Sequence, residues 1–176
     1  MLMPNHVINE VIFRNLSDTQ IVDILSRTTD AEGHIDFSIL LPIPINCWMG
    51  YVSIADEKAF KNTALDWCRE NWGTKWGAYG PHNGAERVGS VLTLRFDSAW
   101  RPPYGWLAAL MNTFNLSFQH NWLSEGEPHG HVGHFIHQPG NVMGDVDWKE
   151  EQASSEIHTH LHVLRWGVEG FDENEE

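Results

Sequence analysis

The sequence has few cysteines, few basic residues and no long apolar run. Its two cysteines, Cys47 and Cys68, follow no metal or redox spacing, which argues against a disulfide framework and favours a reducing cytoplasm. Eleven basic residues against 24 acidic ones give a net charge of −13, which repels phosphate backbones and disfavours nonspecific nucleic-acid binding. We expect a cytoplasmic protein whose acidic surface suits a basic protein partner, including one that itself binds nucleic acid.

Signals for membranes and for catalysis are also missing. No run approaches the ~18 apolar residues of a membrane span, and the first residues lack the basic and apolar segments of a secretory signal. The sequence contains no nucleophile elbow and no phosphate-cradling glycine loop, so we assign no catalytic residue. Glu125 could pair with a histidine as acid and base, but a structural role in the turn before Gly126 is the simpler interpretation.

Length and composition predict one domain. A chain of 176 residues with 41% hydrophobic content can bury roughly 70% of its unfolded surface. We expect a single domain over residues 1–170, with a long inserted connection at about 42–56 and an acidic tail at 171–176.

The first half of the chain predicts a strand, a helix, a second strand and another helix. Residues 6–13 are mostly β-branched or aromatic and indicate the first strand, and Ser17 with Gln20 forms a capping box for a helix ending near Thr28. An extended run from residue 33 to 41 should end at the prolines that follow it. Asp56 then predicts the cap of a helix that reaches Asn71.

The second half predicts strand, helix, strand and strand. Residues 88–96 alternate as a half-buried strand, and Ser98 could cap a helix whose first turn holds two prolines. This helix buries one stripe, formed by Trp106, Leu107, Leu110, Met111 and Phe114. Alternation returns at residues 116–122, and a further strand is expected at 132–136. The order predicts an α+β split βαβ sandwich, with an antiparallel-rich sheet and helices on one face.

Two segments combine tryptophans with glycines and single cations. Residues 71–77 (NWGTKWG) and 96–103 (FDSAWRPP) should form one packed corner in which Trp72, Trp76 and Trp100 are close together and mostly buried. Lys75 follows a predicted helix end, so it could bind the terminal carbonyl groups. It could instead anchor an anionic ligand.

Both segments resemble those of the YubB-like proteins, the phage Api-type ferredoxin-like family of uncharacterised phage and plasmid proteins. Residues 37–44 (FSILLPIP) and 122–126 (WLSEG) are similar to two further elements of that family, so four motifs stand in the same order. Gly77, Arg101 and the histidine-rich run after Glu125 depart from its pattern. The resemblance implies a ferredoxin-like fold and a mobile-element setting, without an activity. The candidate ligand-binding residues are Asn71, Trp72, Thr74, Lys75, Trp76, Trp100, Arg101 and Glu125.

Histidines form a second constellation. The chain has eleven, and His158, His160 and His162 alternate with apolar residues or threonine as they would along one side of a strand. Together with His129 and His131 on a facing strand, His158 and His160 could hold zinc or nickel. A solvated polar face without cofactor explains the same alternation.

These observations predict a non-enzymatic accessory binding protein of a phage, plasmid or other mobile element, which modulates a host protein or a defence system. The alternative is a metal-dependent enzyme or metalloprotein that uses the histidine-rich strands.

Overall fold

A five-stranded antiparallel sheet forms the centre of the molecule. The computed structural model describes residues 5–50, 53, 55, 59, 62–125, 131–137 and 154–167, with the backbone alone at 131–137. The strands are β1 (His6–Phe13), β2 (Tyr79–Val88), β3 (Val91–Ala99), β4 (Phe118–Ser124) and β5 (His131–His137), and their order is β2-β3-β1-β4-β5. All pairs are antiparallel.

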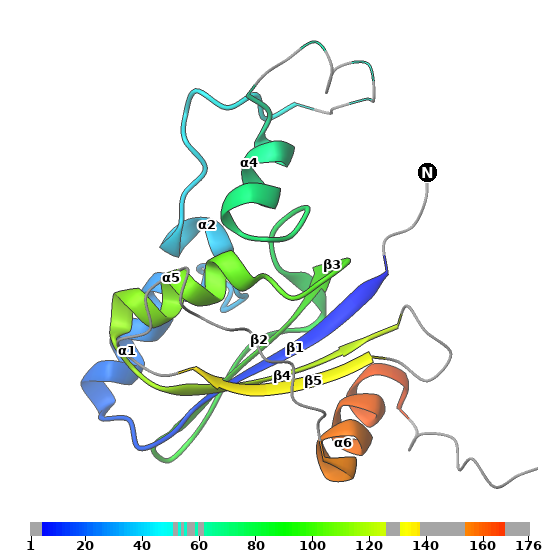
Figure 1. The fold of residues 1–176 in the computed structure, drawn as a ribbon. Coiled ribbons are helices and arrows are strands. Elements are labelled where there is room, and N and C mark those ends of the chain that lie inside the picture. Colours follow the sequence, from blue (N-terminus) through cyan, green and yellow to red (C-terminus); the bar gives the residue numbers. More distant parts are fainter. Residues whose placement is uncertain are drawn as a thin grey trace, which may run out of the picture.

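Helices lie on both sides of this sheet. On one side lie α1 (Asp18–Thr28), α2 (Phe37–Leu40) and α5 (Tyr104–Phe114), with α4 (Ala64–Asn71) beyond them, and α6 (Ser155–Trp166) lies against the opposite face (Figure 1). Strands β1 to β4 with α1 and α5 follow the β-α-β-β-α-β order of a ferredoxin-like domain. The predicted α+β class, antiparallel sheet and helical layer are therefore confirmed, and α6 adds a helix on the other face.

The main core lies between the sheet and the helical layer. Phe37 is its aromatic centre, because its ring lies 4.6 Å from that of Trp106, 5.2 Å from that of Phe96 and 5.6 Å from that of Trp72. All four side chains are buried. Buried aromatic residues of this size contribute most of a core's apolar area, so this cluster fixes three of the four motifs against one another.

Several local predictions are confirmed. β1 covers the predicted residues, and the capping box of α1 has both hydrogen bonds, with Gln20 N donating to Ser17 Oγ at 3.2 Å and Ser17 N donating to Gln20 Oε1 at 2.9 Å. In the predicted α5 stripe all members are buried except Phe114, which is half-buried. β4 begins two residues later than predicted.

Other local predictions are wrong. The expected strand at residues 33–41 is not formed: Ile35 makes only an isolated bridge with Thr29, and Phe37–Leu40 is the short helix α2. Asp36 caps α2 by accepting a hydrogen bond from Ser38 N. α4 begins only at Ala64 and is capped by Thr63, while Asp56 lies outside the described residues. Ser98 belongs to β3, and the cap position of α5 is Pro103.

β2 was not predicted from the sequence. It forms a hairpin with β3 through a two-residue connection at Gly89 and Ser90, where Gly89 has a φ of 59° that favours glycine. β2 is an edge strand with mostly exposed side chains, it contains Pro81, and its register with β3 shifts between Tyr79 and Gly84. Such a strand lacks the apolar alternation from which strands are recognised.

Within the described residues no helix has the length and apolarity needed to cross a membrane. The predicted acidic tail at 171–176 and most of the second half of the 42–56 connection lie outside the described residues.

Candidate functional site

Trp72 anchors the first tryptophan motif in the core. It closes the C-terminus of α4, and its indole Nε1 donates a hydrogen bond of 2.9 Å to the carbonyl oxygen of Leu41. The rings of Phe37 and Trp67 each lie 5.6 Å from the Trp72 ring. With 4% of its surface exposed, Trp72 is a structural member of the motif.

The loop after Trp72 touches α5 at the level of the backbone. Trp106 N donates to Trp72 O at 3.2 Å, and a Cβ atom added to Gly105 would lie 2.0 Å from the carbonyl oxygen of Asn71. Gly73 has a φ of 83°, and its Cα faces the Tyr104 amide so closely that a Cβ there would be 3.1 Å away. Only glycine at position 105 allows this approach, so the loop is placed by the first turn of α5.

Three further contacts join the loop to the connection between β3 and α5. The buried Thr74 hydroxyl donates to Ala99 O at 2.9 Å and accepts from Ala99 N at 3.1 Å. Arg101 Nε donates to Gly73 O at 2.6 Å. Within the connection itself, Ser98 Oγ donates to Arg101 O at 2.8 Å. The two tryptophan motifs therefore form one unit, as the sequence predicted.

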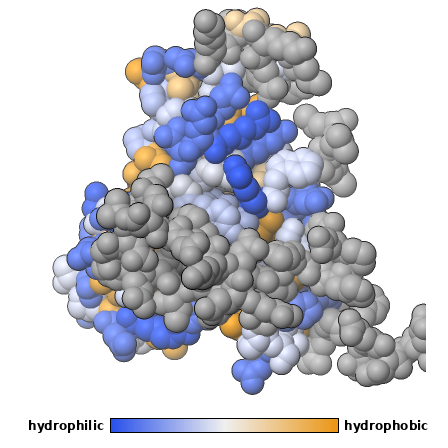
Figure 2. Space-filling view, viewed as in Figure 1, coloured by the Kyte–Doolittle hydropathy of each residue, from blue (hydrophilic) through white to orange (hydrophobic). Residues whose placement is uncertain are grey.

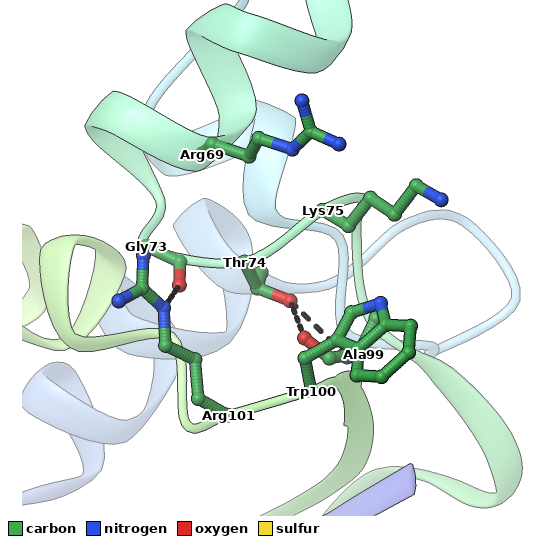
Figure 3. A pocket seen from close by; sticks show the side chains of 7 residues that line it. All are labelled: Arg69, Gly73, Thr74, Lys75, Ala99, Trp100 and Arg101. Carbon is green, nitrogen blue, oxygen red and sulfur yellow. Dashed lines mark hydrogen bonds between the residues drawn. The ribbon is translucent and has the colours of Figure 1, made fainter. Parts of the chain in front are cut away.

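A cleft of about 510 Å³ opens where the two motifs meet. The side chains of Arg69, Lys75, Trp100 and Arg101 line it, over Gly73, Thr74 and Ala99 (Figure 3). Arg69 and Lys75 extend above the Trp100 indole, whereas Arg101 turns towards Gly73 (Figure 3). Hydrophilic side chains also gather on the surface around α4 and the adjoining loop (Figure 2).

The cleft concentrates positive charge on an acidic protein. Arg69 lies 3.5 Å from Asp66, but the ion pairs of the described residues include neither Lys75 nor Arg101. Lys75 Nζ lies 5.1 Å from the centre of the Trp76 ring, and Arg101 uses one of its five N–H donors on Gly73. Both cations therefore keep donors for an anionic group.

Lys75 does not serve as a helix-end partner among the described contacts. At the end of α4, Trp72 N and Gly73 N both donate to Cys68 O, and Asn71 Nδ2 donates to Trp67 O at 2.9 Å. No described hydrogen bond joins Lys75 to the last carbonyl groups of α4. The second interpretation of Lys75, as an anchor for an anion, stays a prediction.

Trp76 and Trp100 are not buried, contrary to the prediction. Their exposed fractions are 38% and 46%, and only Trp72 of the three belongs to the core. Trp100 also has a φ of 74°, while its backbone N–H donates to Asn5 O at 2.8 Å. A bulky residue in the left-handed region costs about 1 to 3 kcal/mol, and such residues concentrate at functional sites.

The structure separates the predicted ligand residues into groups. Thr74, Lys75, Trp100 and Arg101 line the cleft, whereas Asn71, Trp72 and Trp76 support or flank it. Arg69 was missed by sequence reasoning, although its place in the last turn before the motif could have indicated it.

Glu125 lies outside the cleft. Its carboxylate accepts from His6 N at 2.8 Å and from Arg165 Nη2 at 2.6 Å. Burial acts to raise the pKa of Glu125, but these hydrogen bonds outweigh it and lower the pKa below its usual value. Glu125 therefore ties the start of β1 to α6, which is a structural role different from the closing of the turn before Gly126 that the sequence suggested.

A family comparison covers most of these elements. Residues 71–166 match the model of a family described as the ferredoxin-like domain in Api92-like protein. The chain belongs to this family. No curated protein and no solved structure matches the chain. The matched range begins at Asn71 and includes both cleft motifs, and it ends at the last residue of α6, so α6 is part of the Api92-like domain.

The C-terminal histidines of the Api92-like domain lie on a helix, contrary to the predicted strand. Ser154 caps α6, and its apolar residues Ile157, Leu161 and Leu164 pack on Ile8 and Leu123 of the sheet. His158 and His162 lie one helical turn apart, with ring centres separated by 5.9 Å, and His160 points elsewhere, to Glu10.

The predicted metal site is thus not assembled as expected. A strand would have placed His158, His160 and His162 on one side, but α6 leaves at most two of them adjacent. His129 and the side chain of His131 lie outside the described residues. Among the described residues the one group of metal-capable side chains is Asp30, Glu32 and His34, whose Asp30 Oδ1 already accepts from two backbone amides.

A charged network holds α6 against the sheet. Glu10 is buried in β1 and binds Arg95 Nε at 2.9 Å, and His160 Nε2 lies 3.0 Å from the same carboxylate. Burial acts to raise the pKa of Glu10, but the hydrogen bonds from His160 and Arg95 lower it overall. Nearby, Arg165 Nη1 donates to the buried Asp97 at 3.1 Å, and burial raises the pKa of Asp97 despite this cation.

Proposed function

We propose that the chain is a non-enzymatic accessory binding protein of a phage, plasmid or other mobile element, and that the cleft between the two tryptophan motifs is its ligand site. The ligand is an anionic group. The observation that carries this proposal is that Arg69, Lys75 and Arg101 all line one cleft of a protein whose net charge is −13.

The electrostatics of the cleft are local. At physiological ionic strength the screening length is about 8 Å, so acidic residues elsewhere on the surface contribute little to the potential inside the cleft. Cations from three different segments then act together on a bound anion, and charge-assisted hydrogen bonds to oxyanions are the strong ones. Thr74 and the glycines hold these segments together, so the site is set by the fold.

The remaining surface suggests a second contact. The excess of acidic residues suits a basic protein partner in the cytoplasm, and the family setting suggests a host protein or a component of a defence system. Phage or plasmid genes on either side of the coding sequence would support the mobile-element setting. A coding sequence embedded among chromosomal housekeeping genes would count against it.

Titration with inorganic pyrophosphate by isothermal calorimetry tests the cleft. We expect binding at about millimolar strength or tighter, and a loss of about tenfold in Lys75→Ala, because one charge-assisted contact is removed. Lys75 is partly exposed on a loop, so this variant should keep its fold.

Arg14→Ala is the matched control. Arg14 follows β1 directly, at the end of the strand away from Ala99, where its Nη1 donates to Gln119. The two ends of β1 are about 25 Å apart at strand spacing, so this variant changes net charge equally without touching the cleft. Equal weakening in both variants, or no heat with pyrophosphate, would refute the cleft as an anion site.

A further inference from the structure

Trp100 is held at the rim of the cleft rather than packed into the core. Its two neighbours in the chain are both held by hydrogen bonds. The Thr74 hydroxyl binds the backbone N–H and C=O of Ala99, and the Arg101 guanidinium donates to Gly73 O. The Trp100 amide itself is bound to Asn5. Because neighbouring backbone groups are fixed on both sides, the left-handed backbone of Trp100 is held in place and its exposed side chain starts from a defined point of the rim.

Trp100 is 46% exposed. Within the described residues no aromatic or cation–π contact involves Trp100, whereas Trp76 contacts Tyr79 and Lys75. An exposed indole is a platform on which planar groups stack, and nucleic-acid bases stack on such platforms irrespective of their identity.

The cleft limits the size of what can stack there. Its volume of about 510 Å³ lies within the range of small-molecule sites. A long polyanion would extend past the three cations onto a surface with an excess of acidic residues, where it would be repelled. A ligand with one planar ring and one compact anionic group fits both limits.

We infer that the cleft binds a nucleoside phosphate, with its base on the Trp100 indole and its phosphate groups on Arg69, Lys75 and Arg101. This inference rests on the proposed function, because it uses the same cations, and it adds the base as the second determinant. In this proposal Trp100 selects anions that carry a base, whereas the three cations bind anions in general.

The test compares adenosine 5′-diphosphate with inorganic pyrophosphate, both in magnesium-free buffer, by isothermal calorimetry. Both carry a diphosphate group, and only one carries a base. We expect the nucleotide to bind at least tenfold more tightly than pyrophosphate, as stacking of one base on an aromatic side chain implies. In Trp100→Asn this ratio should fall to about one with pyrophosphate affinity unchanged, because asparagine tolerates the left-handed backbone but offers no ring.

Two variants make the test specific. Trp100→Phe should keep a reduced preference for the nucleotide, since it retains a smaller aromatic face. Trp76→Ala is the matched control, because Trp76 is an indole of similar exposure in the adjoining motif that does not line the cleft, so its ratio should stay that of the unaltered chain. The amide spectrum of each variant shows whether the fold is retained.

The outcomes separate this inference from the proposed function. Equal affinities for the two ligands would overturn the nucleotide while leaving the anion site in place, and failure of both ligands to bind would overturn both. If a 5′-phosphorylated oligothymidine bound more tightly than adenosine 5′-diphosphate, with an affinity that falls steeply with salt, the ligand would be the end of a nucleic-acid strand. That result would overturn the free nucleotide as the ligand. If Trp76→Ala lowered the ratio of nucleotide to pyrophosphate affinity more than Trp100→Asn does, the base would stack on Trp76, and the assignment to Trp100 would be refuted.

Discussion

Gly105 should be the most sensitive position of the cleft scaffold, although it lies inside a helix and binds nothing. In Gly105→Ala the new Cβ would lie 2.0 Å from the Asn71 carbonyl oxygen and 2.8 Å from its carbonyl carbon. Real Cβ contacts are not shorter than 3.0 Å, so the loop and the helix must separate by about 1 Å. Both groups are backbone, and no side-chain rotation relieves the clash.

The magnitude follows from three contributions. Overpacking of a closed contact costs about 1 to 3 kcal/mol, and the Trp106 N to Trp72 O hydrogen bond, weakened by the separation, contributes about 1 kcal/mol. Alanine gains back up to ~1 kcal/mol of helix propensity over glycine. We expect Gly105→Ala to lower the free energy of unfolding by about 1 to 4 kcal/mol.

Urea unfolding followed by circular dichroism measures this loss, with Gly77→Ala as the control. Gly77 lies in the same motif, but a Cβ there would meet only the edge of the Trp72 ring at 3.9 Å. That variant should stay within about 0.5 kcal/mol of the unaltered chain. If Gly105→Ala proved neutral or stabilising, the close approach of α5 to the loop, and with it the placement of the cleft, would be refuted.

Four other predictions concern stability and binding. Trp72→Ala should cost about 3 to 5 kcal/mol, the loss expected for a buried large aromatic, whereas Trp100→Asn should cost less than ~1 kcal/mol because relief of backbone strain offsets the lost partial burial; urea unfolding compares them. Glu10→Gln should cost about 3 kcal/mol at pH 7, since it breaks a buried ion pair. The folded-state pKa of Glu10 is lowered from 4.5, so this difference should be complete above that value and shrink as the pH falls below it, in unfolding curves at pH 7 and pH 3. Duplex DNA should show no micromolar binding in a fluorescence anisotropy titration, and a steep salt slope would contradict this. Zinc should bind no tighter than about micromolar in a competition assay with a chelating dye, because His158 and His162 offer two ligands where structural zinc takes four.

The sequence predicted elements whose local and tertiary preferences agree. The capping box at Ser17 and the continuous apolar stripe of α5 agree with the tertiary packing, so α1 formed where expected and α5 buries the predicted stripe, although it begins only at Tyr104. α6 was mistaken for a strand because its histidines alternate with apolar residues over a short run. Its decisive signals were the cap at Ser154 and the helical spacing of Ile157, Leu161 and Leu164, which the alternation concealed.

The sequence identified most residues of the candidate site but did not predict which of them are exposed or how they are arranged. The cations and indoles were identified from two motifs, but burial depends on which side of the loop each indole faces, and no periodicity encodes that for Trp76 and Trp100. Arg69 was missed although its place in the last turn before the first motif could have indicated it. It joins the cleft only because Gly105 brings α5 and the end of α4 together, which is a property of the tertiary contact.

The irregular edge strand β2 restricts how copies of this domain can associate. Pro81 has no amide hydrogen to offer a neighbouring strand, and the register shift between Tyr79 and Gly84 breaks the regular spacing that an incoming strand would have to match. Continuous pairing of a second sheet along this half of β2 is therefore disfavoured, as it is at the protected edges of many β proteins. A domain present at high concentration gains from such an edge, because the rate of chain-to-chain sheet growth rises with the concentration of the chain.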